Sequence, residues 1–275
     1  MDLETTAGRF AALETFDMPC PECGKQLLRP KVLSRETGKK MAGACIHCGY
    51  MQPPTERGAR AKRAPELQRQ ARKNKSLAYY REHSVLGNMA IVAKDFHNFV
   101  AANDGQQRML TFAHGVANQI VQGKKIHALL IGTAGTGKSH IANGILLEVM
   151  QKSDWKLMCM FVDLPKLIEL RKTSIHDGQD DVRRHADDIM HQIGQADVVV
   201  IDDLGAERGT EYDVALVDQI FRLREDETTI ITTNMTGTQL KATFDERTMS
   251  RMSSHAQGNT FAVRGIADQR QEVHG

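Results

Sequence analysis

The octapeptide GTAGTGKS, residues 132–139, constrains the fold of this chain more than any other feature. It fits the pattern G-x-x-x-x-G-K-[ST], follows the apolar run HALLI and opens the helical stretch HIANGILLEVM. A strand, a glycine-rich turn and a helix in that order let backbone N–H groups close around a triphosphate at a helix N-terminus, where the dipole favours anions. The pattern therefore predicts an α/β fold with a nucleotide phosphate site.

Each residue of this loop has an expected role. The glycines allow the tight turn, Lys138 bridges the β- and γ-phosphates, and Ser139 ligates Mg²⁺. The predicted cofactor-binding set is Gly132, Thr133, Ala134, Gly135, Thr136, Gly137, Lys138, Ser139 and His140. The alternative is a glycine-rich turn without a ligand, and a second motif argues against it.

The second motif is ADVVVIDDLG, in which four apolar residues predict a buried strand that ends at Asp202 and Asp203. A carboxylate at the carboxyl end of such a strand is suited to a second Mg²⁺ contact, which we assign to Asp202. Asp203 then orients or deprotonates the attacking water. Many such ATPases carry the longer Glu there, so we expect slow turnover. Asn234 ends the run TIITTN and is expected to hold that water, although an Asn at a strand end is usually a turn former.

Short apolar runs alternate with amphipathic stretches from about residue 85, a pattern typical of a parallel sheet covered by helices. We expect five strands, at about 127–132, 156–163, 197–202, 228–233 and 259–263. Helices are expected between them, at about 138–152, 164–172, 181–193, 212–225 and 238–252.

Four cysteines form two C-x-x-C pairs, CPEC and CIHC, near the start of the chain. This spacing closely matches a four-thiolate zinc site, because each pair forms a knuckle that supplies two tetrahedral ligands. The predicted zinc ligands are Cys20, Cys23, Cys45 and Cys48, with His47 as a bystander. Cys159, inside LMCMF, is expected to be a buried apolar residue.

Composition suggests three parts: a zinc-binding domain at 1–52, a basic linker or helix at 53–84, and an ATPase domain at 85–275. Net charge is only +2, so any basic surface must be local. Residues 57–75 are basic, and either a solvated linker or a contact with nucleic-acid phosphates explains them. Further candidates for DNA contact are Arg171, Lys172, Arg183 and Arg184, although each is individually better explained as a solvated charge. No apolar run approaches the roughly 20 residues of a membrane span, and a cytoplasmic location is expected.

Two arginines lie four residues apart in TFDERTMSRM, at 247 and 251. On a helix they share a face, where they could pair with neighbouring acids or reach an anion that this molecule does not carry. An ATPase gains from an arginine that a neighbouring subunit supplies to the γ-phosphate. A salt bridge to an acid on the same helix is the alternative for Arg251.

The order of phosphate loop, VVVIDDLGAE, TTN and ERTMSRM resembles the AAA+ helicase loaders of the DnaC/DnaI type, including phage-encoded versions, over roughly residues 85–270. The resemblance implies an AAA+ three-layer sandwich with a five-stranded parallel sheet and without the small C-terminal lid. It also implies that Arg251 is the arginine finger, with Arg247 in support, and that Arg270 in ADQR is a sensor arginine.

The same resemblance implies a function and partners. The chain would be a slow ATPase that uses ATP, Mg²⁺ and Zn²⁺, associates with itself through the ATP interface, and loads a DnaB-type hexameric replicative helicase onto single-stranded DNA in a bacterial cytosol. The zinc module would dock the helicase, as in the DnaI branch. Three alternatives remain open: a transposition helper on duplex DNA, a zinc-bearing DNA-binding regulator in which ATP is structural, and a small-molecule kinase.

Overall fold

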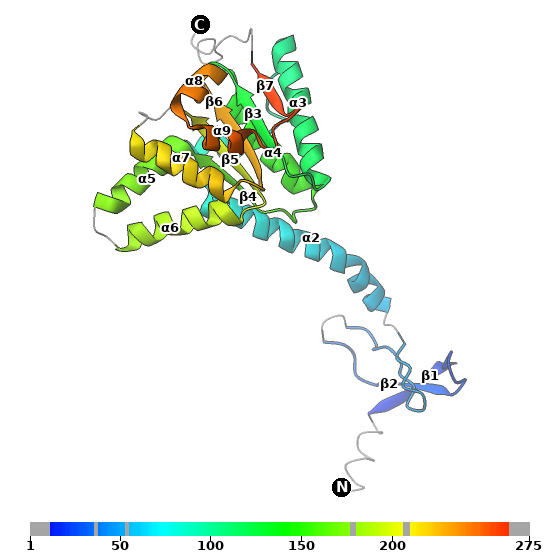
Figure 1. Cartoon of the computed structure of the whole chain (residues 1–275). Helices are drawn as coiled ribbons and strands as arrows, with labels where there is room; N and C mark the ends of the chain where they lie inside the picture. The colour runs from blue at the N-terminus through cyan, green and yellow to red at the C-terminus, as the bar shows by residue number, and fades with distance from the viewer. Residues whose placement is uncertain (1–11, 36–37, 53–54, 177–179, 206–209, 264–275) are drawn as a thin grey trace. The chain divides into compact units, whose positions relative to one another are not determined.

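The computed structural model describes residues 12–35, 38–52, 55–176, 180–205 and 210–263. The chain divides into two compact units, Met1–Gln70 and Ala71–Gly275, and each is treated separately (Figure 1). No described helix is both long and apolar enough to cross a membrane.

The larger unit is built on a five-stranded sheet with the order β4-β5-β6-β3-β7. Every neighbouring pair of strands is parallel, as the sequence predicts. All carboxyl ends therefore meet at one edge. The strands are β3 (His127–Ile131), β4 (Cys159–Asp163), β5 (Val198–Leu204), β6 (Thr228–Thr233) and β7 (Thr260–Ala262).

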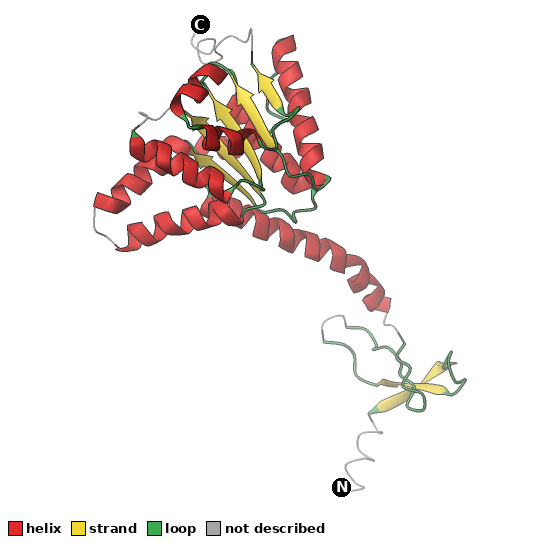
Figure 2. Cartoon of the chain, viewed as in Figure 1, coloured by secondary structure: helices red, strands yellow, loops and turns green. Residues whose placement is uncertain are grey.

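Helices cover both faces of this sheet, which gives three layers (Figure 2). Alternate strand residues face opposite cores: Val198 and Val200 pack with one helix set, whereas Val199 and Ile201 pack with the other. The first set is α3 (Asp104–Val121) and α4 (Lys138–Lys152), and the second is α5 (Leu164–His176), α6 (Asp180–Gln195) and α7 (Glu211–Leu223). The strands are apolar on both faces, as expected for a buried parallel sheet.

The single helix expected at 238–252 is wrong, because the structure has two helices there. They are α8 (Gly237–Thr243) and α9 (Glu246–Ser253). Phe244 adopts an extended conformation between them and is buried. Asp245 then caps α9 by accepting a 2.8 Å hydrogen bond from the Thr248 N–H. Because an N-cap residue has non-helical dihedral angles, α8 cannot continue through Asp245 into α9.

Two long helices, α2 (Thr55–His83) and α3, precede the first strand of the sheet and are not among the five helices expected from the sequence. Asn103 caps α3 by accepting from the Gln106 N–H at 3.0 Å. The basic segment forms α2, and the boundary between the two units falls within it. Ser76 and Tyr80 are buried, and Tyr80 belongs to the core that α3 and α4 share. Residues 71–83 therefore pack with the ATPase unit, which differs from a domain that begins at residue 85.

The smaller unit has little apolar interior. Two antiparallel strands, β1 (Leu13–Pro19) and β2 (Gln26–Pro30), precede a loop that returns through Ala44, which bridges to Leu28. Among its described residues the buried cluster contains only Cys20, Leu27 and Cys45, with Tyr50 packed against it. So small a core needs an additional cross-link such as a metal ion.

Candidate nucleotide site and cysteine cluster

Most of the predicted phosphate-site residues meet around one cavity at the carboxyl edge of the sheet, whereas Gly132 and Thr133 are not among the residues that line it. The cavity has a volume of about 570 Å³, within the range of small-molecule sites. The phosphate loop follows β3, and Asp202 and Asp203 lie near the carboxyl end of β5. Asn234 follows β6, which pairs with both β3 and β5. The lining residues are Gly87, Asn88, Ala90, Ile91, Lys94, Ala134 to His140, Phe161, Asp163, Asp202, Asp203 and Asn234.

The phosphate loop turns into α4 at Gly137. This residue has a left-handed φ of 89°, and a Cβ there would lie 2.8 Å from the Phe99 ring. Only glycine fits both conditions. No side chain caps the N-terminus of α4, so its first N–H groups remain directed toward the loop and the positive end of the helix dipole favours an anion.

Lys138 is buried at the centre of the loop. Its Nζ donates to the carbonyl oxygens of Gly132 at 2.9 Å and Thr133 at 2.8 Å, and to Asn234 Oδ1 at 2.8 Å. The ammonium is therefore held by the loop and by Asn234, the residue expected from the sequence to bind the attacking water. Asn234 keeps its Nδ2 group for a further acceptor.

Asp202 and Asp203 occupy an irregularity in the sheet. The pairing of β5 with β6 shifts register between Ile201 and Leu204, and Asp203 has a left-handed φ of 58°. The Asp203 N–H donates to Thr232 Oγ1 at 3.0 Å. A bulge of this kind re-aims side chains beside a site, and a non-glycine residue in left-handed conformation is a form of strain found at functional positions.

The Asp202 carboxyl is buried and hydrogen-bonded. Thr232 Oγ1 donates to its Oδ1 at 2.5 Å, and the Ser139 hydroxyl also bonds to it. Burial raises the pKa of Asp202 to about 6, and the charges of Asp203 and Asp163 add to this effect. The two predicted Mg²⁺ ligands are thus in contact, and hydroxyl and carboxylate oxygens are the donors that Mg²⁺ prefers.

His140 contacts the segment that precedes α3, on another wall of the cavity than the phosphate loop. Its Nε2 lies 2.7 Å from the Asp95 carbonyl oxygen, and its ring meets Phe99 edge-on. The 3-10 helix η1 (Met89–Ala93) and Lys94 form this wall. The sequence of this wall, NMAIVAK, carries no catalytic side-chain pattern and did not predict a role for it. Only its position before the phosphate loop could have indicated one.

Arg251 is paired within its own chain. Its Nη1 donates to Asp218 Oδ1 at 2.7 Å and its Nε to Glu225 Oε2 at 3.2 Å. The first acceptor is on α7 and the second follows it, so Arg251 is salt-bridged as the alternative interpretation supposed, but to acids outside its own helix. Arg247 is exposed on α9. Arg270 lies outside the described residues.

Most of the basic residues considered for DNA contact also have acidic partners. Arg171 pairs with Asp187 at 2.5 Å, Lys172 with Asp213 at 2.6 Å and Arg184 with Asp181 at 2.6 Å. Arg183 is exposed. These pairs support the interpretation of individual surface charges over a shared nucleic-acid surface on α5 and α6.

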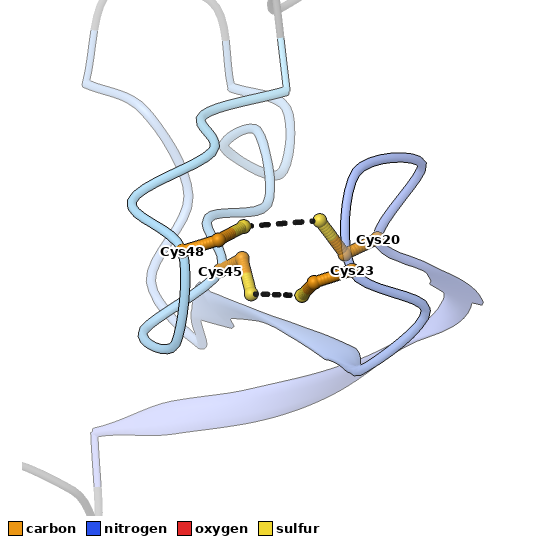
Figure 3. Close-up of side chains that lie close together, drawn as sticks. All are labelled: Cys20, Cys23, Cys45 and Cys48. Atoms are coloured by element: carbon orange, nitrogen blue, oxygen red, sulfur yellow. Dashed lines mark hydrogen bonds between the residues drawn. The ribbon is translucent and has the colours of Figure 1, made fainter.

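The four cysteines converge on one point in the smaller unit (Figure 3). Their Sγ atoms all lie within 4.8 Å of one another, and the pairs Cys20–Cys48 and Cys23–Cys45 are each 3.5 Å apart. Zn–S bonds of about 2.3 Å in a tetrahedron would place sulfurs roughly 3.8 Å apart. The cluster therefore fits a tetrahedral thiolate site.

The two C-x-x-C segments repeat one backbone design. In each, the first cysteine's N–H donates to the carbonyl five residues later, Cys20 to Lys25 and Cys45 to Tyr50, both at 2.7 Å. Gly24 and Gly49 follow the second cysteines with φ values of 71° and 79°. The N–H groups of Cys48 and His47 bond to the Cys45 sulfur and lower its pKa to about 6. Such donors favour the thiolate form that binds metal.

Comparison with known proteins agrees with this geometry. The sequence is 25% identical over 160 residues to the uncharacterized protein YdaV of Escherichia coli strain K12, which covers 58% of this chain and 61% of YdaV. It is 23% identical over 159 residues to the replicative helicase loader DnaC of the same strain, which covers 57% of this chain and 62% of DnaC. The matches thus span less than two thirds of these relatives.

The fold is shared with a solved structure of a protein named DnaI. The crystal structure of DnaI aligns with a TM-score of 0.54 and 21% identity, over 70% of this chain and 100% of that chain. The AAA+ sandwich and the DnaC/DnaI likeness expected from the sequence are confirmed. A family model described as IstB-like ATP binding protein matches residues 65–253, so the chain belongs to that family of ATP-binding proteins.

Proposed function

We propose that this protein binds and hydrolyses ATP to load a DnaB-type hexameric replicative helicase onto single-stranded DNA. The observation that carries the ATPase part is the cavity in which the phosphate loop, the β5 carboxylates and Asn234 meet. The loader part is supported by the similarity to a relative named as a replicative helicase loader.

The residues of the cavity divide the chemistry among them. Loop N–H groups and Lys138 would bind the β- and γ-phosphates. Ser139 and Asp202 would hold Mg²⁺, which when bound neutralises charge on the phosphates. Asp203 would orient or deprotonate the attacking water, with the Asn234 amide as its second contact. Because Asp203 is one methylene shorter than Glu, we expect slow turnover.

The reaction would be completed between copies of the chain. Arg251 lies on α9, whereas the phosphate loop follows β3, and within the chain Arg251 pairs with Asp218 and Glu225. We infer that assembly through the ATP interface brings Arg251 to a neighbour's γ-phosphate, with Arg247 in support. Hydrolysis would then occur only in the assembled complex, and it would release the loader from the helicase.

The smaller unit would be the helicase-docking module. Cys20, Cys23, Cys45 and Cys48 would hold one Zn²⁺ ion, whose binding supplies folding free energy that the small core lacks. Exposed apolar residues of this unit that precede α2 are candidates for the docking surface: Met18, Val32, Leu33, Met41, Ile46 and Met51.

A loading assay tests the proposal. Purified chain, the DnaB-type helicase of the same genome and closed circular single-stranded DNA are mixed with ATP, and helicase retained on the circle is measured. We expect ATP-dependent retention with the wild type and none with Lys138→Ala. Cooperative filaments on duplex DNA would instead support the transposition helper, and binding to a defined duplex site without turnover would support the regulator. Hydrolysis per subunit that is independent of protein concentration would support the kinase.

A further inference from the structure

A buried tyrosine and a buried asparagine connect α2 to the wall of the nucleotide cavity. Tyr80 is 1% exposed and Asn143, on α4, is fully buried. The Tyr80 hydroxyl donates to Asn143 Oδ1 at 2.7 Å. The Asn143 Nδ2 group donates to the carbonyl oxygens of Ile91 at 2.9 Å and Lys94 at 2.7 Å. All the polar groups of the Asn143 amide thus have partners.

The direction of this network follows from its chemistry. The carbonyl oxygens of Ile91 and Lys94 can only accept hydrogen bonds, so the NH₂ group of Asn143 must face them. Its oxygen must then face Tyr80, whose hydroxyl donates. If the hydroxyl is removed, the Asn143 oxygen is left buried without a donor, and the amide keeps only its two hydrogen bonds to the Ile91 and Lys94 carbonyl oxygens.

Apolar packing secures the wall that Asn143 holds only in part, because Ile91 and Val92 contact the core but are half-buried. The helix η1 has five residues, none of them buried. Ile91 and Lys94 both line the cavity. His140 is a second polar contact from α4 to the following segment, through the Asp95 carbonyl. A short exposed turn with so little burial depends on such hydrogen bonds for its position.

The chain between α2 and η1 is also pinned to the sheet. The Val85 N–H donates to the Phe161 carbonyl at 2.8 Å, and the Asp163 N–H donates to the Val85 carbonyl at 2.9 Å. Phe161 and Asp163 both line the cavity. Residues 80–94 are therefore held at Asn143 and at β4, and a shift of α2 residues 71–83 would disturb both contacts.

We propose that Tyr80 and Asn143 are positioning residues for the nucleotide, which couple the docking of α2 residues 71–83 to ATP binding at the η1 wall. The inference rests on the proposed ATP binding. Preorganising a binding wall lowers the cost of ligand ordering. The coupling is reciprocal, so a partner that displaces this part of α2 weakens ATP binding by the same factor that ATP opposes the displacement.

Two neighbouring tyrosines provide a matched pair of variants. Tyr79 lies next to Tyr80 on α2, but its hydroxyl donates to Gln192 Oε1 at 3.0 Å, on α6. Tyr80→Phe removes the hydrogen bond to Asn143, and Tyr79→Phe removes a comparable one remote from the cavity. We expect Tyr80→Phe to raise the Kd for ATP about 5- to 20-fold, and Tyr79→Phe to change it less than about twofold.

A second variant and a second readout complete the test. Asn143→Asp replaces the donors to Ile91 and Lys94 with a carboxylate oxygen, and we expect at least the same loss of affinity. Hydrogen exchange of residues 89–94 in the nucleotide-free chain should be faster in Tyr80→Phe than in Tyr79→Phe. Equal ATP affinities and equal exchange in the two tyrosine variants would overturn the proposal. A wild type that binds no ATP would refute the proposed function instead, and exchange would still decide whether Tyr80 holds the wall.

Discussion

Asp218 on α7 accepts a 2.7 Å hydrogen bond from Arg251 Nη1 on α9. The same Oδ1 atom accepts from Thr248 Oγ1 at 3.0 Å, so Asp218 fixes α9 at two points. The Arg251 side chain is 21% exposed. An arginine oriented by a second helix is preorganised for contact with a neighbouring molecule, since less side-chain freedom remains to be lost.

Loss of the hydrogen bond that Asp218 accepts from Arg251 should lower the rate of ATP hydrolysis without weakening ATP binding. We expect Asp218→Asn to reduce kcat about tenfold while the Kd for ATP stays within about twofold, because in the proposed assembly Arg251 acts on the nucleotide of a neighbouring copy. Arg222→Ala is the matched control: Arg222 also pairs with Asp218, at 2.5 Å, but from the same helix and with 65% exposure. Loss of kcat in both variants would instead indicate general damage to α7.

A substitution at Asp203 should slow ATP hydrolysis without weakening ATP binding. Asn tolerates the left-handed φ of 58° that Asp203 adopts, so Asp203→Asn should fold normally. It lacks the base, and we expect kcat to fall about 10²- to 10³-fold with an unchanged Kd for ATP. Single-turnover hydrolysis and equilibrium nucleotide binding measure the two quantities. Unchanged kcat would remove Asp203 from the mechanism.

The buried carboxylate of Asp202 should lower the free energy of unfolding of the nucleotide-free chain at neutral pH. Its pKa is raised to about 6, so the folded state binds the proton more tightly than the unfolded state, and the free energy of unfolding falls as pH rises toward 6. Asn keeps the acceptor for Thr232 without the charge. We expect nucleotide-free Asp202→Asn to be about 1–3 kcal/mol more stable than wild type at pH 7.5, with the gap narrowing as the pH falls through 6 and closing only below the ordinary carboxyl pKa of 3.8. A pH-independent gap in urea unfolding would contradict this account.

Zinc should be confined to the smaller unit. We expect about one Zn²⁺ per chain in the wild type and none in Cys45→Ser/Cys48→Ser, while nucleotide binding by the larger unit persists. Cys159→Ala is the control, because Cys159 is buried on β4 and should leave zinc content unchanged. Equal zinc content in all three chains, measured by elemental analysis, would rule out this cluster as the site.

Sequence patterns predicted the parts of the fold that depend on local order. The strand expected at 228–233 and the helix expected at 138–152 match β6 and α4 residue for residue, because apolar periodicity and the phosphate loop define their ends. The break at Phe244 was missed, since both sides of it share one amphipathic pattern and only the Asp245 cap separates them.

The site was predictable where chemistry follows chain order, and less so where it depends on tertiary contacts. Asp202 and Asn234 follow strands whose carboxyl ends must meet in a parallel sheet. The η1 wall and the pairing of Arg251 with Asp218 depend on side chains about 50 and 33 residues distant in sequence, and no spacing rule reports them. Tyr80 was hidden within a segment whose charge suggested a linker.

The most direct test of the account is hydrolysis by a mixture of two inactive variants. Lys138→Ala lacks a working phosphate loop but keeps Arg251, and Arg251→Ala keeps the loop but lacks the arginine. If each site is completed by a neighbour's arginine, an equal mixture assembled with the helicase and single-stranded DNA should regain hydrolysis at up to about a quarter of its sites. A mixture as inactive as its components, or an Arg251→Ala chain as active as wild type, would contradict an ATP site shared between copies.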